Sequence, residues 1–250
     1  RSQNEESQMT SIDIVIPVLN EEVALTKCVS DLLEFTRVKL NKYDCRVVVA
    51  DNGSDDSTLR VAKELSTVHG EDNVTFIHLG ERGRGRALRR AWLGSPADVL
   101  LYMDVDLSTK LSALPELISA ISAEGFDLST GSRLKHGAKT TRSFKRDLIS
   151  RSYNLLIKLL FRTRFSDAQC GFKAISNRAA KSLIPFVQNN HWFFDTELLI
   201  LAERTGFKIK DIPVEWEEDS DTRVKIVKTI IEDLLGLVRL RFSRMPDIPK

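Results

Sequence analysis

Short apolar runs alternate with longer amphipathic stretches through the first hundred residues. The runs are rich in β-branched residues and end abruptly at polar or turn-forming positions, which is typical of buried strands. They lie at 12–18, 45–50, 74–79 and 99–103. Helical periodicity follows the first three of them, up to about residue 40, from 56 or 57 to 68, and from 87 to 93. This alternation predicts βαβ units and a mainly parallel, Rossmann-like sheet that helices cover on both faces.

The second half of the chain has fewer clear elements and a different charge. We expect a strand at 126–131, a helix at 148–161 and an amphipathic helix at 224–242 that ends in basic residues. Ten basic residues but only one acid, Asp147, lie between positions 133 and 164. Because the whole chain carries a net charge of only +2, this basic stretch needs an anionic partner or a solvated face.

Composition excludes several classes of protein. With 42% apolar and 29% charged residues the chain is an ordinary globular protein, and disorder or coiled coil is not expected. Its three cysteines have no metal-ligand spacing, which argues against a disulfide framework and structural zinc and favours a reducing compartment. No apolar run approaches the ~18 residues that span a bilayer. We therefore expect a soluble intracellular domain, and a first residue of Arg1 rather than Met is compatible with a piece of a longer protein.

Two acids follow the strand predicted at 99–103. Asp104 and Asp106 are spaced so that both carboxylates can converge on one cation if the backbone turns there. Oxygen ligands suit Mg²⁺ or Mn²⁺, which commonly bridge to substrate phosphates. Isolated pairs of this kind are usually surface loops, but the position at the end of a buried strand favours a metal site. In parallel sheets this is also the edge at which ligands bind.

Other polar groups at the same edge allow two interpretations each. Asp51 is either a turn residue that caps the backbone or a carboxylate that accepts hydrogen bonds from a nucleobase or ribose. Glu21 is either an acid in a first helical turn or a nucleobase contact. The arginines between residues 82 and 90 either bind a diphosphate or solvate the start of a helix, and the segment is neither a P-loop nor a complete GxGxxG.

Arg133, Arg146 and Ser150 in the basic stretch have the chemistry of a phosphate site. Arginine offers a forked, permanently charged set of donors, and serine adds a hydroxyl. A solvated face or contact with anionic lipid headgroups would explain the same residues. The aromatic residues at 192–194 are expected in the core, with Asp195 as a helix-start acid. The four histidines have no ligand spacing and no evident carboxylate partner, and we assign them no role.

Taken together, these segments resemble family 2 glycosyltransferases of the GT-A fold. Within that family they are most similar to polyprenyl-phosphate sugar transferases, particularly the dolichyl-phosphate glucosyltransferase branch and its bacterial relatives. The segments follow the family's order across nearly the whole chain, and DAQCGFK is the most specific of them. They are IVIPVLNEE (14–22), VADNGSDDST (49–58), GRGRALR (83–89), DVDLS (104–108), GSR (131–133), KRDLISRSYN (145–154), DAQCGFKA (167–174) and WFFDTELL (192–199).

The resemblance implies a role for each matching residue. The nucleotide would contact Pro17, Leu19, Glu21, Asp51, Arg84, Val105 and Arg223. The metal and diphosphate would lie on Asp104 and Asp106, and the lipid phosphate on Arg133, Arg146, Ser150 and Gln169, with Asp195 near the sugar. Asp104, Asp106, Arg133 and Arg146 would be the catalytic set. Two departures from the family pattern are Leu19, where an aromatic residue is frequent, and Ser108, where mannosyl relatives often have Gln.

The resemblance also implies one GT-A domain at 12–242, with a nucleotide-sugar half up to 106, an acceptor and membrane-facing half after it, C-terminal amphipathic helices, and tails at 1–11 and 243–250. It implies an inverting transfer of a hexose from a nucleotide sugar, with UDP-glucose first and GDP-mannose next, to a polyprenyl phosphate. The cofactor would be Mg²⁺ or Mn²⁺. The site of action would be the cytoplasmic face of a membrane, reached peripherally or through a membrane module in the same or another chain. Since a lipid phosphate is largely dianionic at neutral pH, we expect no essential general base.

Three other functions compete with this interpretation. A family 2 transferase that acts on a saccharide or protein hydroxyl would need a carboxylate base, for which Asp195 is the only plausible candidate. A nucleotidyltransferase would need a glycine-rich phosphate signature at the first strand, which is missing. A nucleic-acid-binding module would explain the basic stretch but gives no reason for Asp104 and Asp106 at a strand end, so we expect no nucleic-acid partner.

Overall fold

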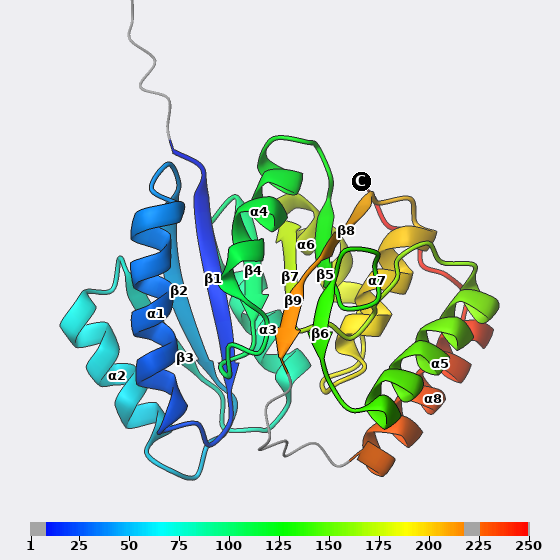
Figure 1. Cartoon of the computed structure of the whole chain (residues 1–250), viewed down its shortest axis with the longest axis horizontal. Helices are drawn as coiled ribbons and strands as arrows, with labels where there is room; N and C mark the ends of the chain where they lie inside the picture. The colour runs from blue at the N-terminus through cyan, green and yellow to red at the C-terminus, as the bar shows by residue number, and fades with distance from the viewer. Residues whose placement is uncertain (1–8, 218–225, 250) are drawn as a thin grey trace, which may run out of the picture.

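A seven-stranded sheet with helices on both faces forms the centre of the molecule (Figure 1). The computed structural model describes residues 9–217 and 226–249. The strand order is β3-β2-β1-β4-β7-β5-β8, and every pairing is parallel except the two made by β7. The strands are β1 (Ser11–Val18), β2 (Asp44–Asp51), β3 (Val74–His78), β4 (Val99–Met103), β5 (Leu128–Ser132), β7 (Phe172–Ser176) and β8 (Ile209–Pro213). A small second sheet pairs β6 (Lys139–Thr141) with β9 (Glu215–Glu217).

Ten helical segments lie between or after these strands in the described residues. They are α1 (Ala24–Lys39), α2 (Thr58–His69), α3 (Arg84–Gly94), η1 (Leu111–Ala113), α4 (Leu114–Ser122), α5 (Phe144–Phe161), α6 (Asn177–Leu183), η2 (Ile184–Phe186), α7 (Phe194–Arg204) and α8 (Ile226–Phe242). In the part of the chain that the structure describes, no helix combines the length and apolar character that crossing a bilayer requires.

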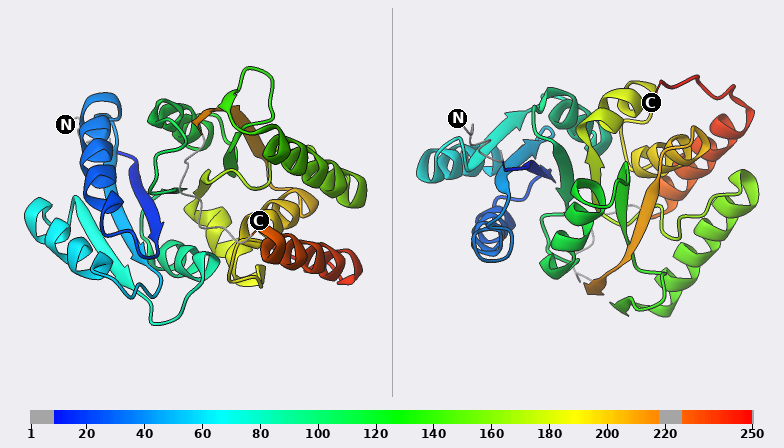
Figure 2. Two further views of the ribbon diagram at one scale, coloured as in Figure 1. Left: turned by 60° about the horizontal axis from the view of Figure 1, so that its bottom comes forward. Right: turned by 90° about the horizontal axis from the view of Figure 1, so that it is seen from above.

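Alternation along the central strands divides the core into two layers. In β1, Ile12, Ile14 and Ile16 point to the layer that α1, α2 and α4 cover, whereas Val15 points to the other. In β4, Tyr102 belongs to that second layer, which α3, α5, α6, α7 and α8 cover. Both faces of a strand are then buried, which is why these strands read as continuous apolar runs. Figure 2 shows the helices on the two sides of the sheet.

The predicted fold class is confirmed, and most predicted elements agree with the structure to within a few residues. The strand expected at 99–103 is β4 itself, and the helix expected at 87–93 begins three residues earlier, at Arg84. The elements that were not predicted are α4, α6, η1, η2, β6, β8, β9 and the reversed strand β7. For α7 only a helix start at Asp195 was expected, one residue from the observed start at Phe194. The start of the helix expected at 224 lies outside the described residues, and the domain limits at 12–242 stay a prediction.

The reversed strand β7 brings a distant loop to the edge where the parallel strands end. Met103, the last residue of β4, is paired with Phe172, the first residue of β7. Because β7 runs against its neighbours, the loop before it reaches the same edge as the loop after β4. The DAQCGFK segment therefore faces Asp104 across the sheet edge.

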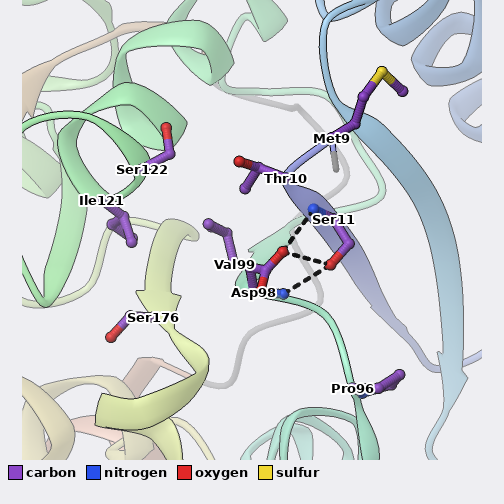
Figure 3. Close-up of a pocket in the computed structure, with 9 residues that line it drawn as sticks. All are labelled: Met9, Thr10, Ser11, Pro96, Asp98, Val99, Ile121, Ser122 and Ser176. Carbon is purple, nitrogen blue, oxygen red and sulfur yellow. Dashed lines mark hydrogen bonds between the residues drawn. The ribbon is translucent and has the colours of Figure 1, made fainter. Parts of the chain in front are cut away.

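The opposite edge carries a hollow of about 550 Å³ (Figure 3). It lies where β1 and β4 begin, and Asp98 accepts hydrogen bonds there from the backbone nitrogen and hydroxyl of Ser11, at 2.9 and 2.8 Å. Its other lining residues include Ile121, Ser122 and Ser176. These groups tie the strand starts together, and none of the site residues predicted from the sequence lines this hollow.

Candidate active site

Three segments that are far apart in the sequence meet around the guanidinium group of Arg84. Its Nη2 donates to Asp104 Oδ1 at 2.7 Å, and its Nη1 donates to Asp195 Oδ2 at 2.6 Å. Arg84 opens α3, Asp104 follows β4, and Asp195 lies in the first turn of α7. The side chain of Arg84 is only 10% exposed. The arginine therefore joins the predicted metal carboxylate to the predicted sugar carboxylate.

The same guanidinium also lies over two aromatic rings. The carbon Cζ lies 4.8 Å from the ring centre of Tyr102 and 5.0 Å from that of Trp192, both within cation–π range. Burial alone would lower the pKa of Arg84, but Tyr102 and the carboxylates of Asp104 and Asp195 hold it well above its usual range. The side chain is a fixed cation in a defined place. Of the two interpretations of this arginine-rich segment, solvation of a helix start does not apply to Arg84.

The glycines on either side of Arg84 explain how the segment approaches α7 so closely. A Cβ atom on Gly83 would lie 2.6 Å from the carbonyl oxygen of Asn190, and Gly83 has a φ of 154°. A Cβ on Gly85 would lie 2.6 Å from the Cβ of Phe194. Side chains at these two positions would push Arg84 away from Asp195. The two glycines of GRG are thus required by packing against Asn190 and against Phe194 of the WFFDTELL segment.

Asp195 has partners on both carboxylate oxygens. Oδ2 accepts from Arg84, and Oδ1 accepts from the hydroxyl of Tyr102 at 2.5 Å, with Lys173 Nζ 3.5 Å away. The carboxylate is 3% exposed, and Lys173 is buried as well. Asp195 is thus buried and bonded to Arg84 rather than open at the sheet edge. Its contact with the sugar stays a prediction.

The two acids after β4 present oxygen ligands at the rim. Asp104 is 43% exposed, and Asp106 is exposed, with Oδ1 accepting from the backbone nitrogen of Ser108 at 2.9 Å. The backbone turns directly after them, where Leu107 has a φ of 56°. Space for Asp104 comes from Gly171, on which a Cβ would stand 1.7 Å from Asp104 Oδ2. This donor set and cradle fit a hard divalent cation that takes its remaining ligands from phosphate and water. The described residues contain no cluster of three or more His, Cys, Asp or Glu side chains able to hold a metal.

Asp51, at the end of β2, is completely buried and bonded within the chain. It accepts from the backbone nitrogen of Ser54 at 3.2 Å and from its hydroxyl, and its Oδ2 lies 2.6 Å from His78 Nδ1. The expectation that no histidine has a carboxylate partner is therefore wrong for His78. The capping interpretation of Asp51 agrees with these bonds, and a direct contact with a nucleobase or ribose stays a prediction.

Asn52 is a site-forming residue that the sequence analysis missed. Its Nδ2 donates to the carbonyl oxygen of Val18 at 2.8 Å, and its Oδ1 accepts from the backbone nitrogen of Gly83 at 3.1 Å. The side chain thereby links the ends of β1 and β2 to the start of α3. An amide directly after a strand-end acid was the available signal.

The other predicted nucleotide contacts surround this edge. Half-buried Pro17 lies near the end of β1, and half-buried Leu19 and Glu21 follow the strand. The backbone nitrogen of Glu21 donates to the hydroxyl of Thr58 at 2.7 Å. Val105 is buried between the two rim acids. Arg223 lies outside the described residues.

Arg133, predicted to bind the acceptor, forms a two-pronged ion pair with Asp167. Its Nε and Nη2 donate to the two carboxylate oxygens at 2.7 and 3.0 Å, and its backbone nitrogen donates to Oδ2 at 3.1 Å. Burial alone would raise the pKa of Asp167, but Arg133 holds it below its usual range. The ring of Trp216 packs against the guanidinium, 5.6 Å from Cζ. Asp167, the residue that fixes Arg133, was not predicted from the sequence.

The remaining acceptor residues lie on α5 and in the loop before β7. Arg146 and Ser150 are half-buried on α5. Asn154, one helical turn beyond Ser150, accepts from the backbone nitrogen of Ala168 at 2.9 Å, which attaches α5 to the loop. Gln169 donates from Nε2 to Asp233 on α8 at 2.6 Å. The loop 167–171 thus contacts both helices.

Comparison with known proteins identifies the class of molecule that this fold and edge site define. The model for "Glycosyl transferase family 2" matches residues 13–184. The glycosyltransferase AglD of Haloferax volcanii is 38% identical over 227 residues, which cover 90% of this chain and 35% of AglD. The dolichyl-phosphate beta-glucosyltransferase of Drosophila melanogaster is 31% identical over 225 residues, covering 86% of this chain and 69% of that enzyme. The chain therefore spans about a third of the length of AglD and about two thirds of the fly enzyme.

A solved structure agrees with the fold. Glucosyl-3-phosphoglycerate synthase from Mycobacterium tuberculosis, crystallised with Mn²⁺, uridine diphosphate and glucosyl-3-phosphoglycerate, superimposes with a TM-score of 0.69 at 18% identity. The match covers 93% of this chain and 80% of that one. The chain belongs to glycosyl transferase family 2, as its motifs predicted.

Proposed function

We propose that this chain transfers a hexose from a nucleotide sugar to a polyprenyl phosphate, with inversion at the anomeric carbon, at the cytoplasmic face of a membrane. UDP-glucose is the first candidate donor and GDP-mannose the second. The similarity to dolichyl-phosphate beta-glucosyltransferases from several eukaryotes supports a lipid-phosphate acceptor and a glucose donor.

The state of Asp195 is the observation that carries the choice of acceptor. A sugar hydroxyl needs a base close to the proton that it loses. Asp195, the only candidate from the sequence, is buried and saturated by Arg84, Tyr102 and Lys173. An acceptor phosphate is already anionic and needs no such base. The saccharide alternative therefore has no support in this arrangement.

The chain's own residues would manage two anionic groups that approach one another. Arg84 places a fixed positive charge beside Asp104, where the diphosphate of a donor would lie. Arg133, held by Asp167, retains the donors of Nη1 for an acceptor phosphate. Holding both partners in line removes much of the entropic barrier of a two-substrate reaction.

A divalent cation, Mg²⁺ or Mn²⁺, fits this site on the carboxylates of Asp104 and Asp106. When bound, it would neutralise the departing diphosphate. Mn²⁺ in the glucosyl-3-phosphoglycerate synthase complex, a protein of the same fold, supports a metal of this class.

Exposed apolar side chains on α5 and α8 support contact with a membrane surface. On α5 they are Phe144, Leu148, Leu155 and Leu159, and on α8 they are Ile231, Leu235, Val238 and Phe242. The two helices contact each other, and basic residues flank their apolar side chains. Apolar groups with adjacent basic charge favour anionic lipid surfaces.

The decisive experiment for the reaction offers the purified chain several donors and acceptors. UDP-glucose, GDP-mannose and UDP-galactose are each combined with a polyprenyl phosphate or with a disaccharide, with Mn²⁺ or with a chelator. We expect glycolipid only with the lipid phosphate and metal, at a higher rate with UDP-glucose. Transfer to the disaccharide but not to the lipid would refute the proposal.

Membrane contact is tested by sedimentation with vesicles that contain or lack anionic lipid. We expect Phe144→Ser to reduce binding to anionic vesicles. Val68→Ser serves as the matched control, because Val68 is similarly exposed but lies on α2, on the opposite side of the molecule (Figure 1). Equal binding of both variants would count against a membrane role for α5.

A further inference from the structure

Helix α8 carries a buried acid that meets the acceptor loop. Asp233 is 3% exposed, and its Oδ2 accepts a hydrogen bond from Gln169 Nε2 at 2.6 Å. Its other oxygen, Oδ1, has no hydrogen-bond partner among the described residues. A buried carboxylate with one orphaned oxygen destabilises a fold, so its presence calls for a functional reason.

Packing of α8 does not supply that reason, since other residues attach the helix. Gly236 lies flat on Phe193, where a Cβ would stand 2.4 Å from Cε1 of the ring. Arg239 pairs with Glu197 of α7 at 2.8 Å. These contacts hold the part of the helix that follows Asp233 in place, and an apolar residue at 233 would pack there at a lower desolvation cost.

The groups that face Asp233 come from four elements. Gln169 approaches from the loop before β7, Tyr153 from α5, Asp195 from α7 and Glu232 from α8 itself. Burial raises the pKa of Asp233 to about 7, the bond from Gln169 opposes this rise, and the charges of Glu232 and Asp195 add to it. The hydroxyl of Tyr153 is directed to Thr196, 3.1 Å away.

We propose that Asp233 is a positioning residue that orients the side-chain amide of Gln169 for the phosphate of the acceptor. This inference rests on the proposed function, because it assigns Gln169 to an anionic acceptor. An ionised carboxylate can only accept hydrogen bonds, so Asp233 binds the NH₂ group of the Gln169 amide and turns the amide carbonyl oxygen away from itself. The amide nitrogen carries two hydrogens, and the bond to Asp233 leaves the second for a phosphate oxygen. An unrestrained amide could instead present its carbonyl oxygen, which repels phosphate.

The test measures acceptor and donor KM separately for wild type, Asp233→Asn and Gln169→Ala across pH 5.5 to 8.5. For Asp233→Asn we expect the acceptor KM to rise about tenfold at pH 8, since a charged acceptor makes a stronger hydrogen bond than a neutral one. The donor KM should not change. In wild type the acceptor KM should rise as the pH falls through 7. Asp233→Asn should lack this step and keep only the step near pH 6 that belongs to the lipid phosphate itself.

A double mutant separates positioning from general packing. If Asp233 acts through Gln169, Asp233→Asn should add no further loss in a Gln169→Ala background. Arg239→Gln is the matched control: it loosens α8 without touching Gln169 and should lower the melting temperature while the acceptor KM stays constant.

Additive losses, an unchanged acceptor KM in Asp233→Asn, or the same KM rise in Arg239→Gln would each overturn the inference. If Asp233→Asn does not fold, Gln169→Ala alone must still raise the acceptor KM selectively for the inference to stand. If the wild-type protein does not use a lipid phosphate, both the proposed function and this inference are refuted. If the wild type is active and the variants have an unchanged acceptor KM, only the inference is refuted.

Discussion

Replacing Gly171 by alanine tests the metal site without touching a ligand. Gly171 precedes β7, and an added Cβ would stand 1.7 Å from Oδ2 of Asp104 and 2.5 Å from its Cγ. Ordinary contacts between such atoms begin near 3.4 Å. The Asp104 carboxylate must therefore move by more than about 1 Å, away from both Gly171 and its present bond to Arg84.

We expect Gly171→Ala to cause a small loss of stability but a large loss of turnover. The loss of stability is small because Asp104 is a half-exposed side chain that can rotate away from the added methyl group. Overpacking of this kind costs about 1–3 kcal/mol of unfolding free energy, and here the low end applies. For a chain of this size, 1 kcal/mol lowers the melting temperature by about 2–4 °C. A misplacement of about 1 Å at a reacting centre can reduce turnover by about 100-fold. Function should therefore fall far more than stability.

The assay combines Mn²⁺ binding, followed by electron paramagnetic resonance of the free ion, with melting temperature and turnover. Gly94→Ala is the control, because a Cβ at Gly94, the last residue of α3, meets nothing within 4 Å. Gly94→Ala should melt at the same or a higher temperature and bind Mn²⁺ normally. Normal Mn²⁺ affinity in Gly171→Ala would show that Asp104 is not a metal ligand in the position described here.

Three further predictions follow from the charges of the site. Arg133→Leu leaves the buried carboxylate of Asp167 unpaired and should lower the unfolding free energy by about 3–5 kcal/mol in a denaturant titration, whereas Arg133→Lys should lower it less. Arg84→Lys replaces the rigid fork, whose two nitrogens each hold one carboxylate, by a single ammonium group, so we expect turnover to fall about 10–100-fold with an unchanged fold by circular dichroism. The folded-state pKa of Asp233, about 7, lies above its ordinary value of 3.8, so the stability that this group contributes is complete below pH 4 and lost as the pH rises through 7. The melting temperature of Asp233→Asn should accordingly exceed that of wild type by an amount that grows between pH 4 and pH 7. A difference that stays constant over this range would contradict the raised pKa of Asp233.

The local sequence pattern was sufficient to predict a helix or strand where the element is buried on both faces or has a strong helical period. Strand β4 was predicted to the residue, because five consecutive apolar side chains fill both layers of the core. Strand β7 was not predicted, since FKAIS is short and includes Lys173, whose burial depends on the carbonyl oxygen of Cys170 and on Asp195. For helix α7 the sequence indicated only a start at Asp195 and not its extent, because the helix is buried on nearly all sides and has no polar face that would mark its period.

The sequence by itself determined the alternation of strands and helices, the position of the acids at strand ends and the family. These depend on neighbours within a few residues, where periodicity and turn chemistry leave a readable pattern. Only the tertiary structure decided which charges are partnered. Arg84 lies 20 residues from Asp104 and 111 residues from Asp195, and no local pattern specifies a pairing across such distances. The reversal of β7 brings the loop of Gln169 to the rim, and packing of α8 then brings Asp233 to that loop.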